Sequence, residues 1–209
     1  MKFYDCATAP SPRRARIFIA EKNVEVETIE VDLGGGEQFG AAFRSLNPRC
    51  TVPVLELDDG TVLTENLGIA AYLEAAFPDP PLLGDTATMK GVVANWNARI
   101  ELEGLLPTAD AFRNRTKGMK DHAVTGPRPY AQIPELAARG LERCRDFFAV
   151  LNERLCDNEY IAGERYSIAD ISALCVVDFA AWVKVTIGDD VPHLERWHRQ
   201  VSARPSASL

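Results

Sequence analysis

Residues 46–77 constrain the fold of this 209-residue chain more than any other stretch, because they predict a strand, a tight turn, a second strand and a helix in succession. Asp59-Gly60 lies between two short apolar runs and is a strong hairpin signal. Thr64 is the predicted N-cap of the helix that follows. We expect this helix to bury the face that carries Leu67 and several alanines.

The same stretch brings together groups that suit a small zwitterionic peptide. A cis bond between Val52 and Pro53 would expose the backbone N–H and C=O of Val52, which could then pair with another peptide as a short added strand. The N-terminus of the next helix offers N–H groups to a carboxylate, and the Glu65 carboxylate can bind an ammonium group. An ordinary hairpin that leads into a helix explains the same residues, so the local physics leaves both interpretations open.

The sequence before residue 46 predicts two strands, each followed by a helix. The strands are expected at 2–4 and 24–31, and the helices at 12–21, with Ser11 as N-cap, and at about 38–45. The triple glycine at 34–36 lacks a following Gly-Lys-Ser/Thr and is therefore a turn, not a phosphate-binding loop. Together with the hairpin and its helix, the order is β-α-β-α-β-β-α, which is that of the thioredoxin-like fold.

A proline-rich break, Pro78-Asp79-Pro80-Pro81, marks the predicted domain boundary. We expect an α/β, thioredoxin-like domain at 1–78, a linker at 79–85 and an all-helical bundle domain at 86–209.

Four helices are predicted in the second domain. They are expected to run from 86 or 88 to about 112, from 134 to about 156, from 168 to 185, and onward from 192. Ser167 and Asp170 form a predicted capping box at the third of these, which is apolar almost all round and therefore central. The aromatic and apolar residues expected in the core include Trp96, Trp182, Leu194, Trp197 and Val201.

The composition restricts the compartment and the partners. The net charge is −7 and the pI about 5.1, which argues against a nucleic acid or an anionic membrane as the main partner. No signal peptide is visible, and the longest apolar stretch, 171–187, is interrupted by Asp178 and Lys184, so no membrane span is predicted. The five scattered cysteines include no C-x-x-C pair, which indicates free thiols in a reducing cytoplasm. No histidine combines with cysteines or carboxylates at metal-ligand spacing, so no metal is expected.

Two separate motifs resemble those of the cytosolic glutathione transferases. The first consists of Asn47-Pro48, Thr51-Val52-Pro53-Val54-Leu55 and Thr64-Glu65-Asn66 and resembles the glutathione-binding half of the family. The second, Ser167-Ile168-Ala169-Asp170-Ile171, resembles the capping motif of the family's helical domain. Both motifs occur in the family's order, and the resemblance spans essentially the whole chain.

The resemblance implies a cytoplasmic, homodimeric transferase that binds glutathione as co-substrate and joins it to a small hydrophobic electrophile in detoxification, transferring an alkyl or aryl group. It implies that Val52 pairs with the cysteinyl backbone and that Glu65 and Asn66 hold the γ-glutamyl end. Asn66 stands where the family usually has Ser, and Thr51 where a Lys or Gln often precedes Val-Pro. The implied glutathione-binding residues are Ser11, Thr51, Val52, Pro53, Glu65 and Asn66.

The sequence leaves open which group activates the glutathione thiol. A free thiol has a pKa of about 8.5, and a helix N-terminus with one hydroxyl donor can lower it. The family usually places a Tyr, Ser or Cys after the first strand, but Ala9 or Pro10 occupies the matching position here. Ser11 either caps its helix or donates to the thiol, and Cys6 is a further candidate. The pattern around Ser11 also resembles a fungal and bacterial branch without such a residue, in which the backbone, the helix dipole and a water do the work.

The electrophile pocket is expected in the helical domain, around Phe112, Arg113 and Asn114. Two other functions stay open at this point. One is a glutathione-dependent reductase or peroxidase acting through Cys6, and the other is a non-catalytic binding module that kept the fold.

Overall fold

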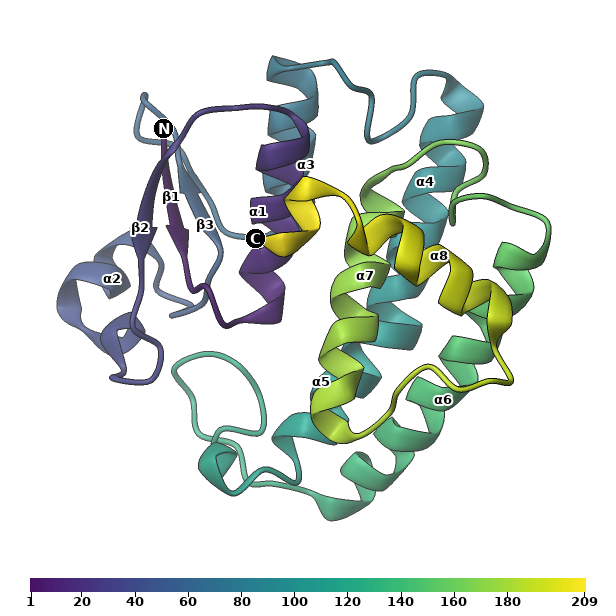
Figure 1. The fold of residues 1–209 in the computed structure, drawn as a ribbon. Helices are drawn as coiled ribbons and strands as arrows, with labels where there is room; N and C mark the ends of the chain where they lie inside the picture. The colour runs from purple at the N-terminus through teal and green to yellow at the C-terminus, as the bar shows by residue number, and fades with distance from the viewer. The chain divides into compact units, whose positions relative to one another are not determined.

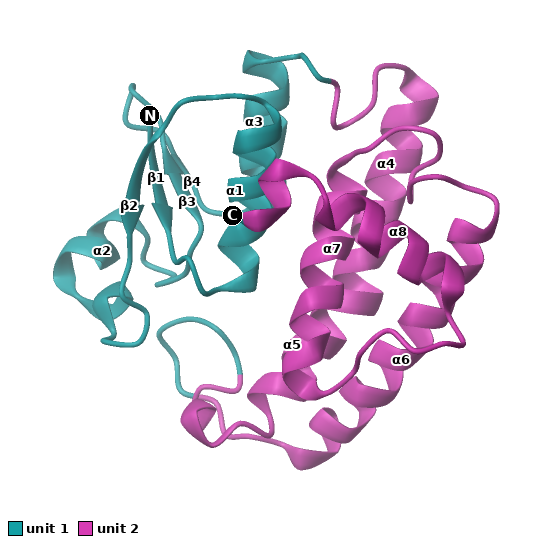
Figure 2. Cartoon of the chain, in the orientation of Figure 1, with its two compact units in different colours: residues 1–80, 124–129, 209 teal, residues 81–123, 130–208 magenta.

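The computed structural model describes all 209 residues and divides into two compact units. Unit 1 comprises residues 1–80, 124–129 and 209, and unit 2 comprises residues 81–123 and 130–208 (Figure 2). Unit 1 has the thioredoxin-like order of strands and helices, and unit 2 is helical, so the predicted fold class is confirmed.

Unit 1 is built on a four-stranded mixed sheet with the strand order β2-β1-β3-β4 (Figure 2). β1 (Lys2–Asp5) pairs parallel with β2 (Glu27–Glu30) and antiparallel with β3 (Val54–Glu56). β3 pairs antiparallel with β4 (Val62–Leu63), and Gly60 takes the positive φ of 84° that the turn between them requires. The predicted hairpin is therefore confirmed.

Helices cover both faces of this sheet. α2 (Ala41–Leu46) lies on the face that carries Tyr4. The rings of Tyr4 and Phe43 meet edge-on, with their centroids 6.2 Å apart. α1 (Pro10–Glu21) and α3 (Asn66–Ala76) pack together on the opposite face (Figure 1). Phe3 and Leu55 are buried on one face of the sheet and Val54 on the other, whereas the edge strand β2 is largely exposed.

Two predictions early in unit 1 are wrong in detail. The second strand covers only Glu27–Glu30 of the expected 24–31. The helix expected at about 38–45 is a 3-10 turn, Glu37–Phe39, followed after Gly40 by α2. Gly40 has an extended backbone with a ψ of 155°, which interrupts the helical conformation between the two segments.

The start of α3 is also shifted, by one residue. Glu65, and not Thr64, is the N-cap. The predicted buried face is wrong as well, because the residues that meet the core recur at the i, i+3, i+4 and i+7 spacing from Asn66, and Leu67 lies off that face. Leu67 is 56% exposed, and the buried positions are Asn66, Ile69, Ala70 and Leu73.

Lys22 links the end of α1 to α3 and to the segment that follows it. Its side chain is fully buried, and its Nζ contacts the Glu74 carboxylate and donates to the carbonyl oxygens of Pro78, at 3.3 Å, and Pro80, at 2.5 Å. A buried ammonium needs such partners because desolvation of an unpaired charge is costly.

Unit 2 is an assembly of helices around α7 (Ile168–Ala180). Every residue of α7 except Asp178 is buried, which confirms its predicted central place. The other helices are α4 (Ala87–Arg99), α5 (Leu106–Arg113), α6 (Pro134–Cys156) and α8 (Pro192–Ser202), and a π-helical segment, Ile100–Leu105, joins α4 to α5. Short 3-10 turns occupy Lys117–Met119, Ala181–Val183 and Pro205–Ser208.

Two of the three tryptophans expected in the core of unit 2 are buried, and the third is exposed. Trp197 is fully buried and Trp96 is 9% exposed, as predicted. Trp182 is 53% exposed, so its predicted place in the core is wrong. α7 ends at Ala180, before the expected residue 185, and Trp182 lies in the 3-10 turn that follows, where the helical periodicity used for the prediction no longer holds.

The predicted capping box at the start of α7 is present. Ser167 Oγ accepts from Ala169 N–H and donates to Asp170 Oδ2, while Asp170 Oδ2 also accepts from Ser167 N–H. Asp170 Oδ1 accepts from the Ile161 N–H and from the Trp197 indole, each at 2.9 Å. Burial raises the pKa of Asp170 to about 6 in spite of these four hydrogen bonds. Across the whole chain, none of the helices combines the length and hydropathy that a membrane span needs.

Candidate functional site

The peptide bond between Val52 and Pro53 is cis. β3 begins only at Val54, and the backbone N–H and C=O of Val52 have no hydrogen-bond partner in the protein. The half-buried Val52 side chain packs on the core cluster beside α2, so its backbone is held in place while its polar groups stay available. This is the arrangement that an added peptide strand requires.

Asn47 holds the loop that leads into Val52. Its side chain is 1% exposed, and its amide Nδ2 donates to the Thr51 carbonyl at 2.8 Å and to Thr51 Oγ1 at 3.1 Å. Its Oδ1 accepts from the Arg49 N–H at 3.0 Å. In the sequence, Asn47 was part of the resemblance alone, although an Asn before Pro is typical of a turn that such a side chain holds.

The N-terminus of α3 is open. The N-cap Glu65 makes no capping bond, and the first N–H of the helix with a backbone acceptor belongs to Ile69. The N–H groups at 66–68 are therefore available to an anion. The Glu65 carboxylate is 70% exposed and lies 3.8 Å from the Arg49 guanidinium. At such exposure this ion pair contributes little, and Arg49 can leave when a ligand arrives.

Ser11 and Asn66 lie together. Asn66 Nδ2 donates to Ser11 Oγ at 3.1 Å, and Asn66 Oδ1 is buried without a partner. Ser11 is not the N-cap of α1: the cap position is Ala9, Pro10 begins the helix, and no side chain caps it. The prediction that Ser11 caps α1 is wrong, because Pro10 with its fixed φ already starts the helix.

The candidate Cys6 and the nearby Tyr4 hydroxyl each lie beside another side chain. Cys6 Sγ is 3.5 Å from Thr8 Oγ1, and Cys6 is 6% exposed. The Tyr4 hydroxyl donates to Glu56 Oε2 at 2.8 Å, and burial together with that carboxylate raises the pKa of the Tyr4 phenol.

Phe112, Arg113 and Asn114 belong to unit 2, at the end of α5. The Phe112 ring packs edge-on against the rings of Phe179 and Trp182, with centroid distances of 5.6 Å and 5.5 Å. Arg113 Nη1 donates to the His122 carbonyl at 2.8 Å, and burial lowers the pKa of the Arg113 guanidinium. The Asn114 amide bonds to the Asp110 carbonyl and to the Ile133 N–H. Arg113 and Asn114 are thus engaged with backbone groups, and Phe112 belongs to a partly exposed aromatic cluster.

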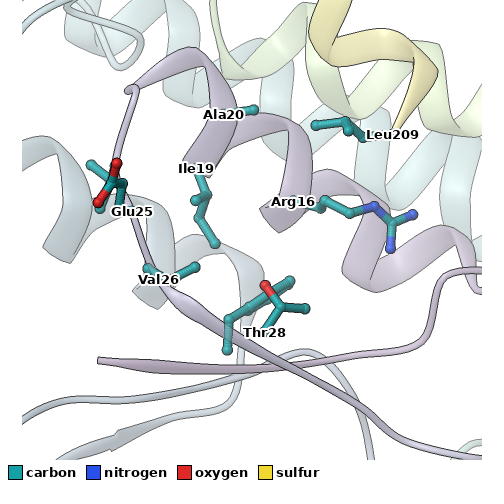
Figure 3. A pocket seen from close by; sticks show the side chains of 9 residues that line it. Arg16, Ile19, Ala20, Glu25, Val26, Thr28 and Leu209 are labelled. Carbon is teal, nitrogen blue, oxygen red and sulfur yellow. The ribbon is translucent and has the colours of Figure 1, made fainter.

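A cavity of about 560 Å³ lies elsewhere in unit 1 (Figure 3). Arg16, Ile19 and Ala20 line it from α1, and Val26 and Thr28 lie on the side of β2. None of the predicted site residues lines this cavity. No group of three or more His, Cys, Asp or Glu side chains in the chain is placed to hold a metal ion.

Comparison with known proteins gives matches over nearly the whole chain. Residues 8–76 match the glutathione S-transferase N-terminal domain, and residues 117–205 match the glutathione S-transferase C-terminal domain. Glutathione S-transferase 2 of Saccharomyces cerevisiae is 37% identical over 99% of this chain and 87% of its own length. The chain therefore belongs to the glutathione S-transferase family.

Solved structures agree with the sequence matches. A glutathione S-transferase domain-containing protein of Marinobacter aquaeolei superposes with a TM-score of 0.91 at 38% identity, over 99% of both chains. Gtt2 of Saccharomyces cerevisiae superposes with a TM-score of 0.90 at 34% identity, over 100% of this chain and 99% of its own.

The family identifies the protein as a glutathione transferase enzyme. Neither alternative from the sequence is favoured, since the matched relatives are named transferases and Cys6, which a reductase or peroxidase would use, is buried.

Proposed function

We propose that unit 1 binds glutathione along Val52 and the N-terminus of α3, and that the enzyme adds the glutathione sulfur to a small hydrophobic electrophile. The observation that carries this proposal is the unpaired backbone of Val52 beside the cis bond to Pro53. Backbone pairing supplies affinity without dependence on side-chain identity, which suits the cysteinyl residue of a peptide. Thr51 is held by Asn47 next to this contact.

The γ-glutamyl end is zwitterionic, and two kinds of group in unit 1 fit it. The open N–H groups of α3 and the Asn66 amide bind its carboxylate, because a helix N-terminus carries partial positive charge. The exposed Glu65 carboxylate binds the ammonium group of the γ-glutamyl end, which replaces the Arg49 guanidinium as its partner. This division explains why an acidic residue followed by an amide stands at this helix start.

The reaction needs a thiolate at the start of α1. Bound glutathione loses its thiol proton to solvent, and the sulfur anion is stabilised by the N-terminus of α1 and by Ser11. The sulfur then attacks an electrophilic carbon. With an aryl halide, a C–S bond forms, the carbon–halogen bond breaks, and the halide ion leaves.

We assign the electrophile to the helical domain. In this proposal residues 1–78 bind glutathione, residues 79–85 link the domains, and residues 86–209 supply the pocket. The half-buried Phe112, backed by Phe179 and Trp182, offers the apolar surface. Arg113 and Asn114 support it by fixing the chain that follows α5.

The remaining parts of the proposal concern the setting of the enzyme. We propose a homodimer that acts in the cytoplasm in detoxification. All five cysteines are free thiols, which fits a reducing compartment. Exposed leucines in both units, Leu67, Leu102 and Leu106, offer surface for a second copy of the chain.

The first test is glutathione binding by calorimetry, with turnover of an aryl halide, in wild type and Glu65→Ala. We expect the dissociation constant to rise roughly fivefold in the variant, about 1 kcal/mol, because the lost partner is a single exposed charge. Glu27→Ala, which removes an exposed carboxylate on β2, is the matched control and should bind as wild type does. Equal binding by Glu65→Ala and wild type would refute the placing of the γ-glutamyl end, and absence of binding in wild type would refute the proposed function.

A further inference from the structure

The first turns of α1 and α3 are joined by one side-chain hydrogen bond within unit 1. Asn66 Nδ2 donates to Ser11 Oγ at 3.1 Å, across 55 positions of sequence. Asn66 is 9% exposed, and its Oδ1 is buried without a partner. Nδ2 makes only this one hydrogen bond, so its second hydrogen is unused as well. A buried amide that leaves bonding capacity unused is uncommon in folded proteins, so Asn66 calls for a role beyond packing.

The direction of this bond decides where the Ser11 proton lies. A hydroxyl has one hydrogen to donate and two lone pairs that accept. Because Ser11 Oγ accepts from Asn66 and caps no helix, its own hydrogen stays available to a different acceptor. An aspartate in place of Asn66 would reverse the bond and take that hydrogen.

Other donors are scarce at the start of α1. Pro10 and Pro12 have no N–H, and the Arg13 N–H bonds to the Ala9 carbonyl at 3.4 Å. The N–H of Ser11 is the one amide hydrogen left in this turn. An anion at this helix end therefore depends on two groups of the same residue, the N–H and the O–H of Ser11.

We propose that Asn66 is a positioning residue for the reaction, which holds the Ser11 hydroxyl with its hydrogen directed to the glutathione sulfur. The proposal rests on the proposed glutathione site and adds a link between its two ends. Nδ2 has two hydrogens: one binds Ser11, and the other binds the γ-glutamyl carboxylate at the N-terminus of α3. Binding of the γ-glutamyl carboxylate therefore fixes the Asn66 amide, and the amide in turn fixes the Ser11 hydroxyl that donates to the thiolate.

The experiment titrates the thiolate of bound glutathione by its ultraviolet absorbance in wild type, Ser11→Ala, Asn66→Ala, Asn66→Asp and the Ser11→Ala/Asn66→Ala double variant. We expect each single variant to raise the pKa of the bound thiol by about one unit, the order expected for one hydrogen bond to a charged atom. The double variant should raise it no further than Ser11→Ala does, because both changes remove the same donor.

Two measurements separate positioning from binding or folding. The dissociation constant of S-methylglutathione, which has no thiol, reports the peptide site alone, and thermal unfolding reports the fold. Thr28→Ala is the control, since Thr28 is an exposed residue of β2 and has no bond to Ser11. Asn66→Asp nearly preserves the size of the side chain and should raise the thiol pKa even where S-methylglutathione still binds.

The inference is overturned if both Asn66 variants weaken S-methylglutathione binding but leave the thiol pKa at its wild-type value. It is also overturned if the shifts of the two single variants add in the double variant. Failure of wild type to bind S-methylglutathione, or to lower the thiol pKa, would instead overturn the proposed function on which the inference rests.

Discussion

Single residues in this protein act by making several hydrogen bonds in places without water. Asn47 uses both ends of its amide to hold the loop before Val52. Asp170 accepts four hydrogen bonds while almost completely buried. In each case one short side chain replaces water for several backbone groups, and its removal leaves buried donors without acceptors.

Asp170→Asn should be strongly destabilising although the two side chains have nearly the same shape. All four groups that meet the Asp170 oxygens are donors, so the NH₂ of an asparagine would face two of them. We expect a loss of about 3 kcal/mol near neutral pH, measured by urea unfolding. A loss below about 0.5 kcal/mol would contradict this account of the network.

The same pair of proteins should differ in pH dependence. The pKa of Asp170 is raised to about 6 in the folded state, above its unfolded value, so the folded protein binds the extra proton. The contribution of this group to stability is full below about pH 4 and is lost as the pH rises through about 6. The stability gap between wild type and Asp170→Asn should therefore widen on acidification from pH 7 to 4, by up to about 3 kcal/mol. If the stability difference instead narrows on acidification, the pKa of Asp170 is lowered and not raised in the folded protein.

Between elements, close approach of helix backbones decides the packing of unit 2. α5 and α6 meet at Gly140, where an added Cβ would lie 2.5 Å from the Pro107 carbonyl oxygen and 2.8 Å from the Ala111 nitrogen. The π-helical segment before α5 contains Gly104, where an added Cβ would lie 2.5 Å from the Phe147 ring. Glycine at these positions lets helices approach at a distance that any side chain would prevent.

Gly140→Ala tests this approach, with Gly91→Ala as its matched control. Both glycines are helical, but nothing lies within 4 Å of a Cβ at Gly91, on α4. Gly91→Ala should stabilise the protein by about 0.5–1 kcal/mol through helix propensity. Gly140→Ala should destabilise it by about 2 kcal/mol, because the clash is with rigid backbone. Similar shifts in the unfolding midpoint for both variants would rule out the close crossing.

For the molecule as a whole, the exposed leucines are the feature that the folded chain leaves unexplained. Leu102 and Leu106 are 58% and 53% exposed and stand four residues apart on the continuous helical run, so they share one face. Leu67 is similarly exposed on α3. Burial of such side chains in a homodimer would remove their apolar surface from water.

We expect sedimentation at twice the chain mass of 23.0 kDa in wild type. The Leu102→Asp/Leu106→Asp double variant should sediment as a monomer, because burial of two carboxylates in an apolar contact is unfavourable. Val124→Asp, at a loop position that is 51% exposed, should leave the assembly as it is. A wild-type monomer at micromolar concentration would refute the proposed homodimer.

Strong local signals made most elements predictable. The Asp59-Gly60 hairpin, the Ser167 capping box, α6 and the buried stripe of α8 occur where the sequence placed them. Errors arose where the local signal was ambiguous. The cap of α3 is Glu65 and not the predicted Thr64, and α1 begins at Pro10 and not at the predicted Pro12. At the candidate site, the roles proposed for Val52 and Glu65 come from the sequence pattern, whereas the bonds of Asn47 to Thr51 are seen only in the structure.

The sequence alone determined the order of strands and helices and the stretch that carries the candidate site, because periodicity, turn residues and caps act over a few neighbouring positions. The family was indicated by the resemblance of two motifs. Only the tertiary structure decided that Ser11 meets Asn66, that Lys22 is buried among backbone carbonyls and that Trp182 is exposed. Such contacts depend on the rotation of each helix against its neighbour. A shift of one residue turns a side chain by about 100°, and no local pattern contains that information.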